Sequence, residues 1–129
     1  MIAGEKIRVL IVDDHKILRE GLAGLLRTQA DIDVIGEADD GETAVCLARD
    51  LEPDVVVMDV SMPNVNGIAA THRISVERPS VRIVALSLHE SEQMAAALVE
   101  AGASAYLTKG GSSEELIAAI RNELPKKPR

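Results

Sequence analysis

Short runs of aliphatic residues alternate along this chain with longer segments in which apolar residues recur every three or four positions. Runs of the first kind are typical of buried strands, and spacing of the second kind predicts helices with one apolar face. The runs predict five strands, at residues 7–12, 33–38, 55–59, 81–86 and 104–107. The helical spacing predicts five helices, which begin near residues 15, 41, 68, 91 and 112 and end near residues 26, 50, 77, 101 and 124. Because every strand is followed by a helix, we expect an α/β fold with a parallel sheet covered on both faces.

Capping residues mark the ends of these helices. We expect Asp14 and Asp40 to cap the first two helices, since Asp accepts a hydrogen bond from a free backbone N–H at that position. Ser112 followed by Glu115 has the form of a capping box at the start of the last helix. Gly102 is placed to end the fourth helix.

The third predicted strand is an apolar run that ends in a single acid, Asp59. Met62-Pro63 then interrupts regular structure, and Asn66-Gly67 permits the positive φ of a tight turn. Asp59 should therefore lie at the mouth of a loop at the carboxyl edge of the sheet, where α/β sheets bind ligands. A single acid in this position is more often a helix cap or a solvated loop residue, so the interpretation depends on its neighbours.

Four other polar residues follow strands in the same way: Asp13 and Asp14 after the first, Ser87 after the fourth and Lys109 after the fifth. The carboxyl ends of parallel strands meet at one edge, so all four should lie there with Asp59. In a sheet of order 2-1-3-4-5 the first and third strands are neighbours, and three carboxylates converge. Such carboxylates repel one another unless a cation lies among them. Oxygen ligands with open positions suit Mg²⁺ or Mn²⁺.

A cation beside a carboxylate, with an ammonium and a hydroxyl close by, is suited to phosphoryl transfer, because that reaction depends on positioning and charge stabilisation. Asp59 would be the nucleophile, and the cation, Lys109 and Ser87 would each contact one phosphoryl oxygen. Lys109 and Ser87 taken singly are ordinary loop residues. Their joint placement predicts a phospho-acceptor site.

Composition narrows the class of protein. The chain has 129 residues, 47% of them hydrophobic, with Tyr106 as its only aromatic residue, so the core must be aliphatic. A net charge of −7 argues against direct binding to nucleic acid. Cys46 is the only cysteine, which excludes an internal disulfide. No second His or Cys stands at metal-ligand spacing from His15, so we expect the His15 side chain to face solvent. There is no apolar run of membrane-spanning length and no signal-peptide pattern, so we expect a cytoplasmic protein.

Over residues 6–124 the chain resembles a receiver domain of a two-component response regulator. The segments that carry the resemblance are Ile11-Val12-Asp13-Asp14-His15, Met58-Asp59-Val60-Ser61-Met62-Pro63 with Gly67, Ala85-Leu86-Ser87, and Ala101-Gly102-Ala103-Ser104-Ala105-Tyr106-Leu107-Thr108-Lys109. The Asp-His, Ser-Leu-His and Tyr-Leu-Thr-Lys-Gly segments are most similar to receivers attached to a LuxR-type helix-turn-helix. The resemblance implies a flavodoxin-like, doubly wound five-stranded sheet in the order 2-1-3-4-5 with five helices.

The resemblance also implies a role for each acidic residue. Asp59 would accept a phosphoryl group from a sensor histidine kinase, and the domain would be a signalling module and not an enzyme. Asp14 and Asp59 would bind Mg²⁺ through their side chains, Ser61 through its backbone carbonyl, and Asp13 mostly through water. Mn²⁺ could replace Mg²⁺.

Ser87 and Tyr106 would form the switch that the resemblance implies, with the hydroxyl moving onto the phosphoryl group and the ring turning inward behind it. The receiver would occupy residues 1–124, and residues 125–129 would begin a linker to a DNA-binding output domain that this chain lacks. Phosphorylation would favour a homodimer. This domain would itself contact neither DNA nor a membrane.

Two positions depart from the usual receiver pattern. Leu88 is bulkier than the small residue that commonly follows the switch serine, and Gly110 replaces a frequent proline after the lysine, so no cis peptide bond is expected there. Ser61 and His89 occupy positions that tune the lifetime of the acyl phosphate in this family.

Three other functions fit parts of the pattern. A flavodoxin-like FMN or nucleotide module needs a phosphate-binding loop after the first strand, where Asp13 and Asp14 would repel phosphate. A metal-dependent phosphohydrolase with an aspartyl intermediate would need a general acid two residues after Asp59 and a substrate cap. A degenerate receiver that only docks partners would lack part of the set that is complete here.

Overall fold

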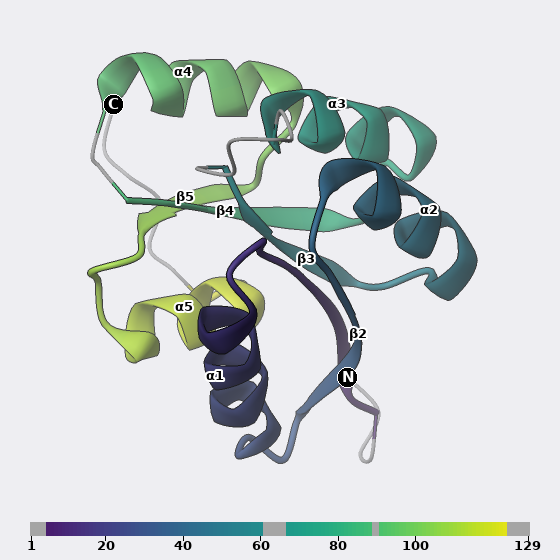
Figure 1. Ribbon diagram of the computed structural model, residues 1–129, viewed down its shortest axis with the longest axis vertical. Helices are drawn as coiled ribbons and strands as arrows, with labels where there is room; N and C mark the ends of the chain where they lie inside the picture. Colours follow the sequence, from purple (N-terminus) through teal and green to yellow (C-terminus); the bar gives the residue numbers. More distant parts are fainter. Residues whose placement is uncertain (1–4, 61–66, 89–90, 124–129) are drawn as a thin grey trace.

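The computed structural model describes residues 5–60, 67–88 and 91–123 (Figure 1). Strands and helices alternate throughout, as the hydrophobic pattern predicts. The elements are β1 (Ile7–Val12), α1 (Lys16–Arg27), β2 (Ile32–Ala38), α2 (Gly41–Leu51), β3 (Val55–Asp59), α3 (Gly67–Glu77), β4 (Arg82–Ser87), α4 (Glu92–Ala101), β5 (Ala105–Thr108) and α5 (Ser113–Ile120). None of the described helices is long and apolar enough to cross a membrane.

The five strands form one parallel sheet in the order β2-β1-β3-β4-β5, which confirms the flavodoxin-like topology. The central strand β3 is buried along its whole length, as its unbroken apolar sequence requires. Met58 lies in register with Val12 on one side and with Ala85 on the other. The ends of β1 and β3 therefore lie side by side, and Asp13 is brought next to Asp59.

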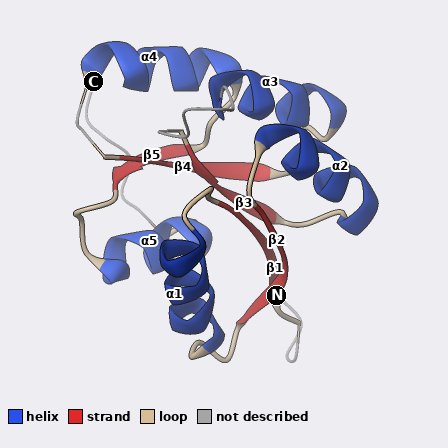
Figure 2. Ribbon diagram, in the orientation of Figure 1, coloured by secondary structure: helices blue, strands red, loops and turns tan. Residues whose placement is uncertain are grey.

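Helices cover both faces of the sheet. Helices α1 and α5 lie on one face, and α2, α3 and α4 lie on the other (Figure 2). Each face has its own aliphatic core, one centred on Leu10, Met58 and Ile83 and the other on Ile11, Val57 and Val84. Adjacent residues of a strand point to opposite faces, so the same short strands supply both cores.

Three predicted caps are present. Asp40 accepts a hydrogen bond of 2.7 Å from the N–H of Thr43 at the start of α2, and Ser112 accepts one of 3.1 Å from the N–H of Glu115 at the start of α5. Gly102 ends α4 with a φ of 113°, which favours glycine because other residues meet steric strain there.

The cap predicted for Asp14 is wrong. His15, not Asp14, occupies the N-cap position of α1, and it makes no side-chain capping bond. The Asp14 side chain turns toward the carboxyl edge of the sheet and contacts His15. An acid after a strand can cap the next helix or face the site, and Asp14 faces the site.

Of the turn predicted at Asn66-Gly67, only Gly67 lies among the described residues; it is the first residue of α3 and is not among the glycines with positive φ. A Cβ atom there would lie 2.8 Å from the Cα atom of Val60 and 3.0 Å from the carbonyl oxygen of Asp59. Close approach to the end of β3 therefore requires glycine. Asn66 lies outside the described residues.

Helix α5 ends at Ile120, earlier than predicted. Asn122 has a left-handed φ of 61°, and the N–H groups of Asn122 and Glu123 donate to the carbonyls of Ala119 and Ala118. This is a Schellman ending with asparagine in place of glycine. The Arg82 guanidinium also donates to the last carbonyls of the helix. Leu124 and residues 125–129 lie outside the described residues.

Candidate functional site

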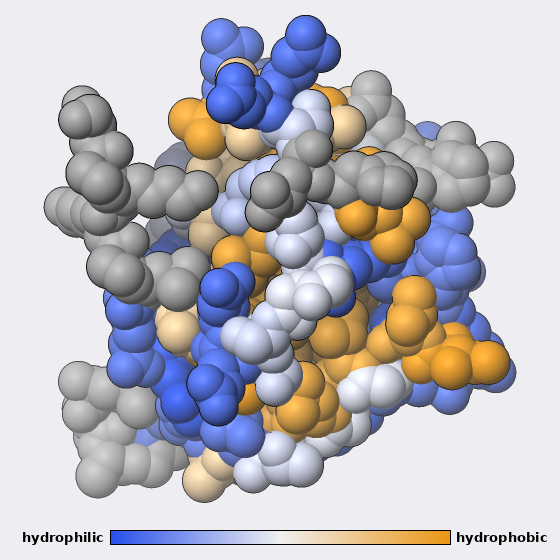
Figure 3. Space-filling view, turned by 90° about the vertical axis from the view of Figure 1, so that its left-hand side faces the viewer, coloured by the Kyte–Doolittle hydropathy of each residue, from blue (hydrophilic) through white to orange (hydrophobic). Residues whose placement is uncertain are grey.

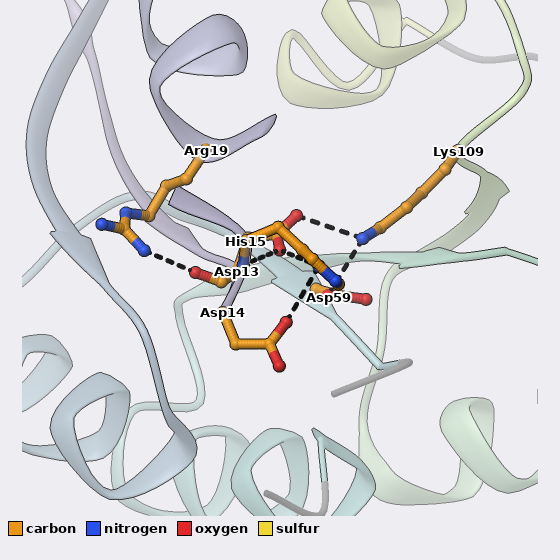
Figure 4. A network of polar contacts seen from close by, with 6 residues as sticks. All are labelled: Asp13, Asp14, His15, Arg19, Asp59 and Lys109. Atoms are coloured by element: carbon orange, nitrogen blue, oxygen red, sulfur yellow. Dashed lines mark hydrogen bonds and ion pairs between the residues drawn. The ribbon is translucent and has the colours of Figure 1, made fainter. Parts of the chain in front are cut away.

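Three charged side chains meet where β1, β3 and β5 end (Figure 4). Asp13 directly follows β1, Asp59 is the last residue of β3, and Lys109 directly follows β5. The Lys109 ammonium lies 3.1 Å from Oδ2 of Asp13 and 3.0 Å from Oδ2 of Asp59. The backbone N–H of Lys109 donates to the carbonyl of Ser87 over 2.7 Å, which fixes the start of the lysine beside β4.

Burial makes these charges strongly interdependent. The side chains of Asp13 and Asp59 are each 1% exposed and that of Lys109 is 12% exposed. Burial alone raises the pKa of Asp13, but the backbone N–H of His15 and the Lys109 ammonium outweigh it and hold that pKa below its ordinary value. Burial alone lowers the pKa of Lys109, but the carboxylates of Asp59 and Asp13 outweigh it and raise that pKa. Asp13 and Lys109 are therefore both charged at neutral pH.

The cluster extends outward through Asp14 and His15. The backbone N–H of His15 donates to Oδ1 of Asp13 over 2.8 Å. Its Nδ1 atom lies 3.2 Å from the same oxygen and 3.0 Å from Oδ1 of Asp14. Arg19 holds the segment from behind by donating to the carbonyl of Asp13 over 2.7 Å and to Oε1 of Glu37 over 3.2 Å. The predicted solvent-facing role of His15 is thus incomplete, because its half-exposed ring contacts two of the site's carboxylates.

The residues present fit a bound divalent cation. Asp13, Asp14, His15 and Asp59 each offer one ligand atom, and these atoms lie within 4.8 Å of one another. The cluster contains three carboxyl groups, and the Lys109 ammonium contacts two of them, those of Asp13 and Asp59. Carboxylate oxygens at this spacing suit a hard divalent ion.

Ser87 lies on β4, the neighbour of β3, and Tyr106 lies on β5, the edge strand beyond β4. Ser87 is the last residue of β4 and is buried, one position beyond Leu86, which is in register with Asp59. Tyr106 on β5 is half-buried and packs against the core on the α2–α4 face. Ser61 and His89 lie outside the described residues.

A hollow of about 230 Å³ adjoins the cluster on the α1–α5 side. Asp13 and Lys109 stand at one end of it, and most of the remaining wall is aliphatic: Leu18, Leu22, Leu25, Leu86, Leu107 and Leu116. Figure 3 faces the side of the molecule at the left of Figure 1, and apolar side chains gather there in the lower half between polar ones. The α1–α5 side therefore carries apolar surface close to the acidic cluster.

The chain matches the family model of the response regulator receiver domain over residues 9–121. It is 42% identical over 115 residues to the response regulator GacA of Pseudomonas aeruginosa, covering 89% of this chain and 54% of GacA. It is 41% identical over 116 residues to the response regulator UvrY of Escherichia coli, covering 90% of this chain and 53% of UvrY. The chain thus spans about half the length of these curated relatives.

Solved structures agree with the sequence relatives. A LuxR-family two-component response regulator from Aurantimonas superposes with a TM-score of 0.86 at 38% identity, covering 92% of this chain and 84% of that one. The receiver domain of the NarL regulator of Mycobacterium tuberculosis superposes with a TM-score of 0.86 at 30% identity, covering 92% and 95%. The fold, the acidic cluster and these matches together lead to one conclusion: the chain belongs to the receiver-domain family of two-component response regulators, and within it is similar to receivers of the LuxR type.

Proposed function

We propose that this domain is a phosphoryl-accepting switch in which Asp59 is the phospho-acceptor. The observation that carries the proposal is the buried Asp59 carboxylate at the end of β3, with the Lys109 ammonium 3.0 Å from Oδ2. An ordinary loop acid would be exposed and would need no dedicated cation. This carboxylate is held in one place and faces groups that can stabilise added negative charge.

In the proposed reaction, an Asp59 carboxylate oxygen attacks the phosphorus of a phosphohistidine on a sensor kinase. The new bond joins that oxygen to phosphorus, while the phosphorus–nitrogen bond breaks and its electron pair returns to the imidazole. Lys109 would remain beside the acceptor and contact one phosphoryl oxygen, and the Ser87 hydroxyl would contact another.

Asp14 and Asp59 would hold Mg²⁺, or Mn²⁺ in its place, with Asp13 acting through water and the Ser61 carbonyl as a further ligand. When bound, the cation neutralises charge on the phosphoryl oxygens. The fit of the carboxylates within 4.8 Å of one another supports this assignment for the three aspartates. Lys109 alone leaves the three carboxylates in excess, and a divalent ion would balance them.

Phosphorylation would act through Ser87 and Tyr106. The Ser87 hydroxyl would move onto the phosphoryl group, and the Tyr106 ring would turn further into the molecule behind it. Tyr106 already packs against the core on the α4 side, which supports a signal that reaches the face formed by α4, β5 and α5.

The partners follow from the family. A sensor histidine kinase would supply the phosphoryl group in the cytoplasm, and phosphorylation would favour a homodimer. The chain spans about half of its curated relatives, so residues 125–129 would begin a linker to a DNA-binding output domain through which transcription is controlled. The net charge of −7 supports contact with DNA through that domain and not through this one.

The proposed role is signalling and not turnover of a substrate, because the phosphorylated group is the domain's own side chain. A metal-dependent phosphohydrolase would use the same acid and cation, but it would need a general acid two residues after Asp59, where this chain has Ser61. Release of many equivalents of phosphate from an added phosphate ester would favour the hydrolase.

Beryllofluoride, which mimics an attached phosphoryl group, tests the proposal directly. We expect Mg²⁺ and beryllofluoride together to shift the backbone amide resonances of Asp59, Ser87, Tyr106 and Lys109 in NMR spectra. The Asp59→Asn variant should show none of these shifts. Unchanged spectra for the parent chain would contradict the proposal.

A further inference from the structure

The ring of His15 contacts the candidate cation site without belonging to the set of oxygen ligands. Its Nδ1 atom lies 3.0 Å from Oδ1 of Asp14 and 3.2 Å from Oδ1 of Asp13. The residue occupies the N-cap position of α1, yet its side chain makes no capping bond. Helix capping therefore does not explain the orientation of the ring.

The spacing of these atoms is that of neighbouring ligands on one metal ion. Two ligands at adjacent corners of a tetrahedral or octahedral shell, with bonds of about 2.0–2.2 Å, lie about 2.8–3.6 Å apart. Both distances from Nδ1 fall in that range, and a ring nitrogen of His15 is within 4.8 Å of a carboxylate oxygen of Asp59 as well. Little movement of the ring would be needed for a nitrogen–metal bond.

The donor set then has a chemical consequence. Mg²⁺ prefers oxygen ligands and gains little from an imidazole, whereas imidazole nitrogen suits Zn²⁺, Ni²⁺ and Cu²⁺. A site with carboxylates alone would bind these metals only through their general affinity for oxygen. A site that adds His15 would bind them more tightly while leaving Mg²⁺ almost unaffected.

We propose that His15 is a nitrogen ligand at this cation site, and that the site therefore binds Zn²⁺ and other late first-row transition metals through mixed nitrogen and oxygen donors. This inference rests on the cation site of the proposed function and adds a class of ligand to it. A transition metal held by His15, Asp14 and Asp59 would occupy the position needed by Mg²⁺, so the two ions would compete.

A hydrogen bond from Nδ1–H to the carboxylates would give the same distances without any metal role. In that case His15 would be a positioning residue that orients Asp13 and Asp14. Its removal would then weaken the binding of Mg²⁺ and of Zn²⁺ to similar extents, since both ions use those carboxylates. Comparison of the two metals separates a ligand from a positioning residue.

Isothermal titration calorimetry with Zn²⁺ alone and with Mg²⁺ alone makes this comparison. The whole chain should carry Cys46→Ser, which removes an exposed thiol that could bind Zn²⁺ elsewhere. His15→Asn is the test variant. His72→Asn is the matched control, because it removes an exposed imidazole on α3 that lies outside the cluster. The ¹⁵N resonance of His15 Nδ1 gives a second readout that does not depend on affinity.

Loss of a group that only orients a ligand already costs about 10-fold to 100-fold in metal affinity, so loss of a direct ligand should weaken Zn²⁺ binding by at least about tenfold. We expect Mg²⁺ binding to change by less than about twofold, His72→Asn to change neither, and Zn²⁺ to shift the Nδ1 resonance. Zn²⁺ affinity within about twofold of the parent in His15→Asn, or equal losses for both metals, would overturn the proposal. If Mg²⁺ fails to bind the parent chain, the cation site of the proposed function fails, and this inference fails with it.

Discussion

Lys109 is the only described cation that contacts both Asp13 and Asp59, so its removal tests the electrostatics of the site. The substitution Lys109→Met keeps an aliphatic side chain of similar length and deletes the ammonium. At separations of 3.0 and 3.1 Å and an effective dielectric constant of about 20, each pair contributes about 5 kcal/mol of gross attraction. Most of that attraction offsets the cost of burying three charges.

The effect on stability comes from the carboxylates that the variant leaves behind. Deleting one partner of a buried ion pair costs about 3–5 kcal/mol, and the partial exposure of Lys109 favours the lower end of that range. We therefore expect about 3 kcal/mol of destabilisation at pH 7.5 without divalent cations. With a urea m-value of about 1.5 kcal/mol/M, the unfolding midpoint should fall by about 2 M.

The pH dependence of the free energy of unfolding gives a second test of the same substitution. In the parent the pKa of Asp13 is lowered, so its contribution is present above the unfolded pKa and is lost as the pH falls. In the variant the uncompensated carboxylates should have raised pKa values, so stability is regained as the pH falls. The difference between parent and variant should therefore shrink between pH 7.5 and pH 4.

The assay is urea unfolding followed by circular dichroism, with and without about 10 mM Mg²⁺. Mg²⁺ should restore part of the lost stability, because it binds only the folded site. Lys16→Met is the control, since Lys16 on α1 is 77% exposed and lies 3.9 Å from Glu20; its effect should stay within about 0.5 kcal/mol. A Lys109→Met midpoint within about 0.3 M of the parent would refute the reasoning.

Three further predictions concern single positions. Asp14→Asn should raise the free energy of unfolding by about 1 kcal/mol without divalent cations, because it relieves like-charge repulsion. It should also abolish the stabilisation that Mg²⁺ gives in urea unfolding. Equal Mg²⁺ effects in parent and variant would count against the cation site. Asp40→Ala should lower the free energy of unfolding by about 1 kcal/mol at pH 7, and Asp40→Asn should lower it much less. The backbone N–H of Thr43 lowers the pKa of Asp40, so the loss of stability in Asp40→Ala should fade as the pH drops through that lowered pKa. A loss that stays constant down to pH 2 would disprove this. Gly67→Ala should destabilise the protein by about 1–3 kcal/mol in thermal unfolding, since its Cβ would press on the backbone of β3 and Val60. Gly21→Ala on α1, with open space around the Cβ, should stabilise it by up to about 1 kcal/mol. Changes of the same sign in both variants would contradict the close approach at Gly67.

The strands and most helix boundaries follow from the sequence because burial in a parallel sheet imposes a clear pattern. Val55 to Met58 are apolar without interruption, and every residue of β3 is buried. The convergence of Asp13, Asp59 and Lys109 follows as well, because each directly ends a strand. The order of the strands does not follow from the pattern alone, and here it came from the resemblance to a known family.

The errors have local physical causes. Asp14 has the residue type of a helix cap, but capping and site-facing roles use the same side chain, and the local sequence does not distinguish them. Gly67 is constrained by contact with the end of β3 and not by its own φ, which no local pattern reveals. The early end of α5 could have been found, because Asn122 is a residue that tolerates the left-handed conformation of a helix ending.

His15 and Arg82 show a further limit of sequence reasoning. The contact of His15 with Asp13 and Asp14 depends on a side-chain orientation that spacing does not encode. Arg82 on β4 donates to the end of α5, 37 and 38 residues further along the chain. Only the packed structure brings such groups together.

The central claim is that Asp59 accepts a phosphoryl group with the help of a divalent cation. Intact-mass spectrometry after incubation with acetyl phosphate, with and without Mg²⁺, tests it on this chain and on Asp59→Asn. We predict a gain of one phosphoryl group that requires Mg²⁺, is removed by hydroxylamine and is absent from the variant. No adduct under any condition, or an adduct of equal yield in Asp59→Asn, would contradict the claim.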